Sequence, residues 1–229
     1  MGHLASPMIE LTKILVLLTI GGAAFLPAQS LSMGVKGGVR ATGDFLYAAT
    51  SESRRYVVGP AATLALPLGF AIEFEALYRC QGYSTGNGTP LYTSSIREAD
   101  NVWEFPLLAR YRIRLPGIRP FAEAGWAPRI THGSEDLSGS YLSQLNPATY
   151  TYYSGRTPTD WPTTHGVVAG GGIQFALGRL QVAPEVRYTH WNRQAISGGF
   201  ADGPGYGSTQ NQLDILLGIG WRVAGPARK

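Results

Sequence analysis

The stretch Phe70–Tyr83, FAIEFEALYRCQGY, alternates apolar and polar residues with a period of two. Successive side chains of a β-strand point to opposite faces, whereas a helix would mix the two sets. The stretch therefore predicts a β-strand with one apolar and one polar face. The apolar face holds Phe70, Ile72, Phe74, Ala76 and Tyr78, and the polar face holds Glu73, Glu75, Arg79 and Gln81.

Two further stretches repeat this pattern clearly. In residues 103–114 the apolar face holds Trp103, Phe105, Leu107, Ala109, Tyr111 and Ile113, opposite Glu104, Arg110, Arg112 and Arg114. In residues 212–223 it holds Leu213, Ile215, Leu217, Ile219, Trp221 and Val223, opposite Gln212, Asp214 and Arg222. Weaker copies lie at residues 34–45, 56–66, 118–130, 165–177 and 180–191. All eight are long enough for a tilted membrane crossing of about 9–11 residues.

Short and long connections alternate between these strands. The short ones carry Pro or Gly and lie at residues 67–69, 115–117 and 178–179. The long, polar ones lie at residues 44–55, 84–101, 131–164 and 193–209. Short inner turns and long outer loops are typical of membrane barrels. The sequence therefore predicts an all-β fold, an eight-stranded antiparallel up-and-down transmembrane β-barrel. Residues 131–164 mix Tyr and Trp with Ser, Thr, Gly and Pro, which suits an adaptable binding surface or, as we favour, strands that extend beyond the membrane. An extra hairpin there would give ten strands.

Composition supports this fold class and excludes others. Only 15% of the residues are charged, whereas soluble domains have about a quarter, and the chain holds 30 glycines and 11% aromatic residues. The net charge of +4 is spread along the chain, so no basic patch predicts nucleic-acid binding. The single cysteine, Cys80, can form no internal disulfide and belongs to no metal-binding motif. We expect no cofactor and no metal.

The first thirty residues have the pattern of a secretory signal peptide. Lys13 precedes the apolar run at residues 14–25, Pro27 follows it, and Ala28-Gln29-Ser30 offers small residues for cleavage before Leu31. An uncleaved N-terminal anchor is the alternative. We therefore predict a signal peptide at residues 1–30 and a barrel domain at residues 31–229. Beyond Leu31 no apolar run approaches 18 residues, so a membrane crossing would require a closed barrel.

The polar faces of the strands would fill the barrel. Eight strands enclose a space just wide enough for side chains, and buried charges must be paired because an unpaired one costs several kcal/mol. A solvated face of a soluble β-sandwich is the alternative. The predicted interior ion-pair network comprises Glu73, Glu75, Arg79, Glu104, Arg110, Arg112, Glu123, Glu185, Arg187 and Asp214.

Aromatic residues gather near the ends of the predicted strands. Such girdles mark the two interfaces of a membrane barrel. On the outer side we predict girdle positions for Phe45, Tyr56, Tyr78, Trp103 and Trp191. On the periplasmic side we predict them for Phe70, Tyr111, Phe175 and Trp221.

On these strands the chain resembles the small outer-membrane barrels of the OmpA and OmpX type. The resemblance covers Leu31 to Val223 and is clearest in VKGGV at residues 35–39 and LDILLGIGW at residues 213–221. It departs from them at the end, because Arg222–Lys229 follow Trp221, where such barrels end on an aromatic residue.

The resemblance implies export to a Gram-negative outer membrane, with lipid, lipopolysaccharide and the barrel-assembly machinery as partners. Such barrels variously anchor, adhere, stabilise the envelope or modify lipids. We predict a monomer without enzymatic activity, whose role is structural or a surface interaction through the outer loops. A narrow porin-like channel is an alternative that the crowded interior opposes.

A lipid A-modifying enzyme is the second alternative. The segment RYTHWN at residues 187–192 resembles a strand of outer-membrane lipid A deacylases, in which a serine follows the catalytic histidine by two residues. Here Asn192 takes that position after His190, and Thr189 lies on the other face, so the base lacks a nucleophile.

A metal site in the longest loop is a further alternative. His132, Glu135, Asp136, Asp160 and His165 lie in or beside that loop, but at spacings that match no metal motif.

Overall fold

The computed structural model of the chain describes residues 30–46, 50–113, 115, 118–143, 149–198 and 206–224. Apart from Ser30, the predicted signal peptide lies outside these residues. No helix in the described part of the chain has the length and hydropathy needed to cross a membrane.

The described residues form strands joined by turns and one 3-10 turn, η1 (Pro67–Gly69). The strands of the first half are β1 (Ser30–Arg40), β2 (Phe45–Leu46), β3 (Thr50–Ser51), β4 (Tyr56–Ala65), β5 (Phe70–Glu75), β6 (Leu77–Thr89), β7 (Tyr92–Glu104) and β8 (Leu107–Arg112). Those of the second half are β9 (Arg119–Leu142), β10 (Tyr150–Leu177), β11 (Leu180–Trp191), β12 (Ser197–Gly198), β13 (Tyr206–Ser208) and β14 (Asn211–Ala224).

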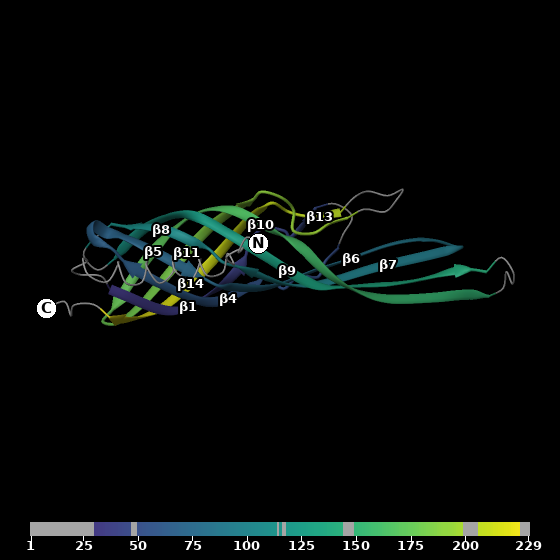
Figure 1. Cartoon of the computed structure of the whole chain (residues 1–229), viewed down its shortest axis with the longest axis horizontal. Helices are drawn as coiled ribbons and strands as arrows, with labels where there is room; N and C mark the ends of the chain where they lie inside the picture. The colour runs from purple at the N-terminus through teal and green to yellow at the C-terminus, as the bar shows by residue number, and fades with distance from the viewer. Residues whose placement is uncertain are drawn as a thin grey trace, which may run out of the picture.

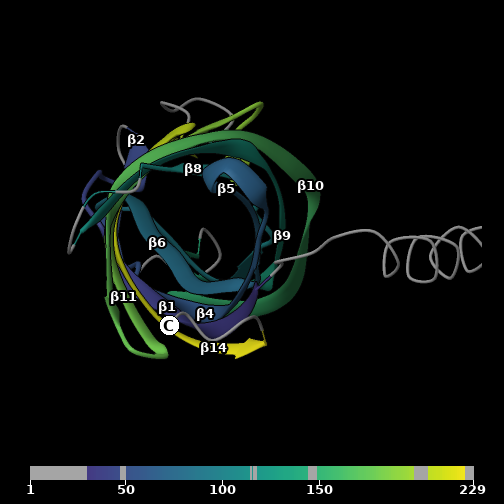
Figure 2. The same ribbon diagram turned by 90° about the vertical axis from the view of Figure 1, so that its left-hand side faces the viewer.

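Eight strands close into a ring in the order β1, β4, β5, β8, β9, β10, β11 and β14, and β14 pairs with β1. Each pair is antiparallel and joins strands that are neighbours in this order. The view along the ring shows it closed (Figure 2). The predicted eight-stranded antiparallel up-and-down barrel is confirmed.

Two of the crossings are interrupted midway. Ala76 separates β5 from β6, and Phe105 and Pro106 separate β7 from β8. Pro106 has no backbone N–H to donate, but its carbonyl accepts one from Glu75 at 3.1 Å. The inward and outward alternation continues across both breaks. Each interrupted pair therefore acts as one long strand, so a single hairpin joins β5–β6 to β7–β8.

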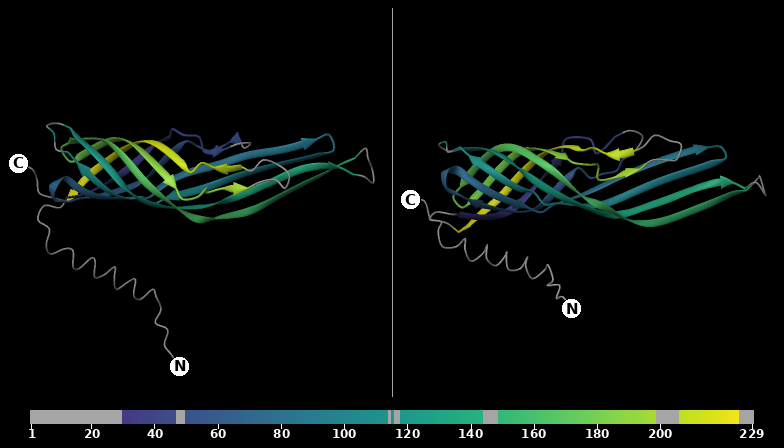
Figure 3. Two further views of the ribbon diagram at one scale, coloured as in Figure 1. Left: turned by 90° about the horizontal axis from the view of Figure 1, so that it is seen from above. Right: turned by 45° about the horizontal axis from the view of Figure 1, so that its top comes forward.

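β6, β7, β9 and β10 continue beyond the ring as a four-stranded sheet (Figures 1 and 3). We call the part formed by residues 82–101 and 131–164 the extension. Most of residues 84–101 and 131–164 are paired strand. The predicted loop at residues 84–101 is therefore wrong, whereas the expectation that strands continue through residues 131–164 is confirmed. The extra hairpin lengthens β9 and β10 and adds no strand to the ring, which keeps eight.

The sequence did not mark these strands because their residues are mainly Ser, Thr, Gly and Tyr. Period-two alternation arises where one face of a sheet is apolar and the other polar. The faces of the extension show no such contrast, so backbone pairing between four adjacent strands organises it instead.

The barrel is apolar outside and polar inside. Exposed apolar side chains include Val35, Ile72, Leu107, Val186 and Ile215, each at least 43% exposed. The buried side chains of the ring are largely charged or amide groups. A small apolar cluster of Tyr83, Ala195 and Ile196, with Phe45, Ile96 and Trp161 packed against it, lies where the extension leaves the ring.

Adjacent glycines on β1 provide a test of how closely the strands approach. A Cβ atom added at Gly38 would lie 2.1 Å from the carbonyl oxygen of Ile215, whereas one at Gly37 would find its nearest atom, the carbonyl oxygen of Val57, at 3.6 Å. We expect Gly38→Ala to destabilise the barrel by about 1–3 kcal/mol or more, because the backbones must separate. Gly37→Ala should be nearly neutral. Urea unfolding in detergent measures both, and equal midpoints would contradict the prediction.

Candidate functional site

Lys36 is the centre of the polar interior. From β1 its Nζ atom contacts Glu73 Oε1 at 2.6 Å, Glu75 Oε1 at 2.5 Å and Glu185 Oε2 at 2.8 Å. These carboxylates come from β5 and β11, so one ammonium group joins opposite walls of the barrel. Lys36 was absent from the predicted network. Its parity on the first strand, opposite Val35 and Val39, is the signal that could have identified it.

Two arginines complete this layer. Arg187 contacts Glu75 at 2.6 Å, Glu185 at 2.7 Å and Glu123 at 3.1 Å. Arg110 contacts Glu123 at 2.6 Å, Glu73 at 2.9 Å and Glu185 at 3.2 Å, and its guanidinium lies 4.0 Å from the centre of the Phe121 ring. We call Lys36, Glu73, Glu75, Arg110, Glu123, Glu185 and Arg187 the central layer.

The central layer leaves no open lumen at its level. All its side chains are at most 5% exposed. Oxygens of Glu73, Glu123 and Glu185 lie within 4.8 Å of one another, a spacing that could hold a metal ion. Lys36, Arg110 and Arg187 already contact these three carboxylates, so the layer is a closed ion-pair network and not a vacant metal site.

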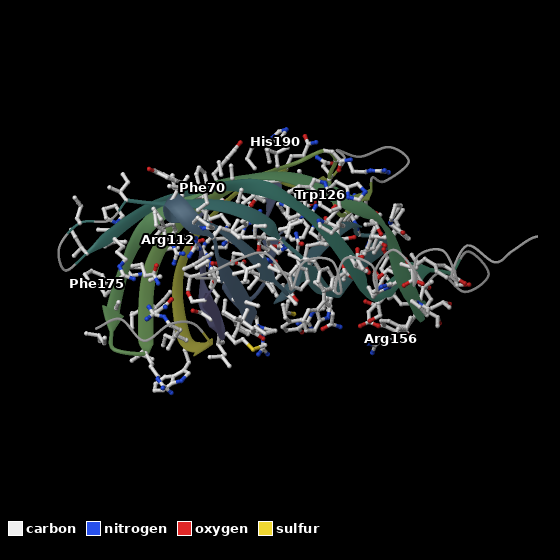
Figure 4. The ribbon with its side chains drawn as sticks, turned by 60° about the vertical axis from the view of Figure 1, so that its left-hand side comes forward. Phe70, Arg112, Trp126, Arg156, Phe175 and His190 are labelled. Atoms are coloured by element: carbon white, nitrogen blue, oxygen red, sulfur yellow. The ribbon has the colours of Figure 1, made fainter. Side chains whose placement is uncertain are left out.

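A second charged layer lies nearer the extension. Arg79 contacts Glu104 at 3.0 Å and Asp214 at 3.1 Å, and the Gln212 amide donates to Asp214 at 2.7 Å. The last predicted member, Arg112, takes no part in either layer. It is half-buried near the short-turn end and donates to Gln174 Oε1 at 3.4 Å (Figure 4).

The structure places seven of the nine predicted girdle residues on the outer surface. Two pairs of tilted rings pack across neighbouring strands: Phe70 with Tyr111 at 5.0 Å and Tyr78 with Trp103 at 5.3 Å between ring centres. They mark two levels of the barrel, the first near the short turns and the second near the extension. The other outward residues are Tyr56, Phe175 and Trp221. The prediction omitted Trp126 and Tyr188, which are also exposed.

The girdle prediction is wrong for Trp191 and Phe45. Trp191 is fully buried, stacks on the Arg129 guanidinium at 3.9 Å and donates from Nε1 to Gln212. Its odd position on β11 shares the inward face with Arg187, so the strand period outweighs its place at a strand end. Phe45 packs on Tyr83 at 5.2 Å in the apolar cluster and not on the outer wall.

His190 projects from the outer surface (Figure 4), and the hydrogen-bond partner that the described residues give its ring is an amide. Its Nδ1 atom lies 2.8 Å from Oδ1 of Asn211, which also accepts a hydrogen bond from the Tyr188 hydroxyl. Thr189 is buried on the opposite face, and Asn192 accepts from the backbone of His165. The geometry therefore gives no support to acyl transfer at His190.

The histidines and acidic residues of the predicted long loop do not converge. His132 Nδ1 lies 2.6 Å from Asp160 Oδ1 on the exposed surface. His165 stacks on Trp126, with 5.2 Å between ring centres, and Asp136 is 3.6 Å from Arg156, far out on the extension (Figure 4). Metal binding by this set has no geometric support.

The outer half of the extension is rich in tyrosine and hydroxyl groups. Tyr153 donates to the Tyr92 hydroxyl at 3.2 Å and Tyr150 to the Pro90 carbonyl at 3.0 Å, so β10 is tied to the β6–β7 hairpin. Tyr141 and Tyr152 are 46% and 79% exposed. A hollow of about 380 Å³ lies between β7, β9 and β10, lined by Thr93, Ser138, Gly139, Ser140, Tyr152, Tyr153 and Ser154. The extension thus presents an ordered surface of aromatic and hydroxyl groups.

The base of the extension holds two buried carboxylates. Glu98 and Asp100, on the inward face of β7, are each 1% exposed. Burial, and then the charge of Glu98, raises the pKa of Asp100 to about 8. Across β7 and β9, burial and the same Glu98 charge raise the pKa of Glu135. Like charges held this close disfavour simultaneous ionisation.

Comparisons with known proteins return structural likenesses only. No family model and no curated protein matches the chain. Among solved structures it is similar to Neisserial surface protein A (8% identity, TM-score 0.43, 85% of this chain and 96% of that one). It is also similar to the N-terminal β-barrel domain of Pseudomonas aeruginosa OprF (12%, 0.42, 86% and 98%).

A third similar structure is Ail, the attachment invasion locus protein of Yersinia pestis, solved with the heparin analogue sucrose octasulfate (10% identity, TM-score 0.34, 86% of this chain and 99% of that one). At these identities nothing about activity or ligands transfers to this chain.

Removing the central cation tests the buried network. We expect Lys36→Met to destabilise the folded barrel by about 3–5 kcal/mol, because it leaves buried carboxylates without a partner. The matched control is Arg97→Met, which breaks an exposed pair with Glu52 and should cost less than about 1 kcal/mol. Urea unfolding of the refolded protein measures both, and similar losses would contradict the prediction.

Asp100 should make stability depend on pH. Its folded-state pKa of about 8 exceeds the unfolded value of about 3.9, so stability is full below pH ~4 and declines as the pH rises through 8. Asp100→Asn removes that decline, at most about 1.4 kcal/mol per pH unit. Its advantage over the wild type should therefore grow between pH 5 and pH 8. Urea midpoints in a buffer free of divalent cations measure it, and a constant difference would refute the assignment.

Proposed function

We propose that this chain is an outer-membrane barrel that anchors a rigid four-stranded sheet outside the cell as a non-enzymatic binding surface. The observation that carries the proposal is the unbroken hydrogen-bonded continuation of β6, β7, β9 and β10 from the wall of the barrel into the extension. A surface held in this way needs no hinge and keeps its shape relative to the membrane.

The outer wall supports membrane insertion. Exposed apolar side chains surround the ring, and packed aromatic pairs lie at two levels, Phe70 with Tyr111 and Tyr78 with Trp103. An apolar band flanked by aromatic girdles is the outward pattern of bacterial barrels, whose short turns face the periplasm and whose long segments face outward. The extension would then lie outside the cell. Export through a signal peptide and assembly by the barrel-assembly machinery are parts of the same proposal.

The interior favours an anchor over the two alternatives. The central layer fills the barrel with ion pairs between Lys36, Arg110, Arg187 and four glutamates, which opposes a porin-like channel. His190 has an amide neighbour and no nucleophile, which opposes lipid A modification. The extension is therefore the part of the molecule that we propose carries the function.

The composition of the extension supports recognition of another molecule. Tyrosine contributes large contact area with little conformational freedom to lose, and Ser, Gly and Asn provide adaptable hydrogen bonds, as in antibody loops. The hydroxyl-lined hollow beside Tyr152 and Tyr153 offers a concave part to this surface. A protein or glycan on another surface is the class of partner that fits.

Trimming the extension tests this role. Residues 86–95 and 138–154 would be deleted, and each gap closed with an Asn-Gly turn between residues that pair in the wild type, Thr85 with Ile96 and Leu137 with Gly155. We expect the trimmed protein to keep its heat-modifiable migration on a gel, because the ring is intact. Vesicles carrying it should lose binding to an array of purified glycans and matrix proteins.

A second variant separates surface chemistry from sheet length. Replacing the exposed Tyr141 and Tyr152 with Ser keeps the strands and should reduce binding about tenfold or more, as for aromatic anchors in other interfaces. If wild-type vesicles bind no better than vesicles with the trimmed barrel, the binding role is wrong and a purely structural role remains.

A further inference from the structure

Gln81, Glu98 and Asp100 form a layer between the ion-paired Arg79 and the apolar cluster around Tyr83. On β6 the inward residues follow in the order Arg79, Gln81 and Tyr83, and Gln81 is the direct cross-strand partner of Asp100 on β7. Glu98 is the next inward residue of β7, two positions before Asp100. All three are at most 2% exposed. We call these three residues the acidic layer.

One oxygen of each carboxylate is held by a donor from β10. The indole Nε1 of Trp161 donates to Glu98 Oε1 at 2.7 Å, and the hydroxyl of Thr159 donates to Asp100 Oδ1 at 3.1 Å. These bonds orient both carboxylates. The second oxygens, Glu98 Oε2 and Asp100 Oδ2, have no hydrogen-bond partner.

Gln81 supplies an independent indication that something is bound here. Its side chain is 2% exposed, and neither its amide oxygen nor its amide nitrogen has a hydrogen-bond partner. Since buried amides are almost always hydrogen-bonded, an unpartnered one beside two carboxylates indicates a missing ligand. The register therefore places one amide and two carboxylates, the oxygen groups that hard cations prefer, on the same inward face of β6 and β7.

The charges of the layers separate the acidic layer from the others. The central layer sets three cations against four carboxylates, and Arg79 lies between Glu104 and Asp214. Among the described residues no Lys, Arg or His lies within ion-pair distance of Glu98 or Asp100. Glu135, half-buried opposite Glu98 on β9, adds more negative charge.

We propose that the acidic layer binds one hard divalent cation of the Ca²⁺ class through Gln81, Glu98 and Asp100. Ca²⁺ takes six to eight oxygen ligands, so waters would complete its shell. Sites of this kind outside cells bind with Kd of about 10⁻⁴–10⁻³ M. Because Trp161 and Thr159 of β10 hold the same carboxylates, the bound ion would tie the β6–β7 hairpin to the β9–β10 hairpin.

The site is independent of the proposed surface role, since it concerns the base of the extension and not the trimmed outer half. It would nevertheless make the stiffness of that half depend on the cation. Without the ion, burial and the charge of Glu98 raise the pKa of Asp100.

The test is a titration of the refolded protein in detergent with Tb³⁺, a luminescent substitute for Ca²⁺. The indole of Trp161 is hydrogen-bonded to Glu98, so it lies close enough to sensitise the ion. We expect saturable terbium emission that Ca²⁺ reverses, and a Ca²⁺ affinity by calorimetry within the range above. Absence of saturable emission, or emission that Ca²⁺ does not displace, overturns the proposal.

Variants locate the ion. Asp100→Asn and Glu98→Gln should each weaken Ca²⁺ binding about tenfold or more, since affinity follows the number of charged ligands. Gln81→Leu keeps both charges and should weaken binding less. The matched control, Asp136→Asn, alters an exposed carboxylate on β9 and should bind as the wild type does. Heat modifiability confirms that each variant is folded.

Wild-type affinity in both acidic-layer variants overturns the proposal, as does an equal loss in Asp136→Asn, which would mean adventitious binding to surface carboxylates. The Gln81→Leu variant keeps the test decisive if a charge variant fails to fold.

Discussion

The structure depends on the pairing of charged side chains inside a narrow barrel, where they contact one another. Lys36 contacts carboxylates from β5 and β11, and Arg110 and Arg187 bridge the remaining ones. A buried ion pair is weak evidence for net stability, but removing one partner is costly. The network therefore favours one register, since a strand that slipped by one residue would turn its charges toward the apolar outer face.

The polar interior ends in different groups at the two ends of the barrel. Toward the short turns the polar interior ends at amides such as Gln174 and Gln181, which bond to each other. Toward the extension it ends at the acidic layer, where Glu98 and Asp100 lack a cation among the described residues. An apolar cluster around Tyr83 then separates this layer from the outer part of the extension. The order of layers along β6 therefore joins the barrel, the proposed cation site and the extension in one strand.

Physical chemistry limits what kind of function this arrangement supports. A filled interior excludes a wide pore, and an outward histidine bonded to an amide lacks the partner that covalent catalysis needs. Both features favour the proposed role as a rigid platform. Its outer half presents Tyr141 and Tyr152 on strands that are fixed by main-chain hydrogen bonds, so little conformational entropy would be lost on binding.

The sequence by itself determined the ring and the two faces of its strands, because the alternation in residues 70–83, 103–113 and 213–223 follows directly from the β-strand period. It also indicated that Glu73, Glu75 and Arg187 would be buried together. Their partner Lys36 has the same inward parity, but it lies in a strand whose pattern glycines interrupt, so its signal is weaker. Trp191 lies at a strand end, but its parity on β11 places it inside the barrel.

Only the tertiary structure decided the extension and the acidic layer. Residues 84–101 and 131–164 become strands because four neighbours supply backbone partners to one another, which no local pattern encodes. Likewise, Gln81 and Asp100 are nineteen positions apart in the chain and meet only through the register of β6 on β7. Local sequence fixes which face a side chain occupies, whereas its neighbours depend on pairing across strands.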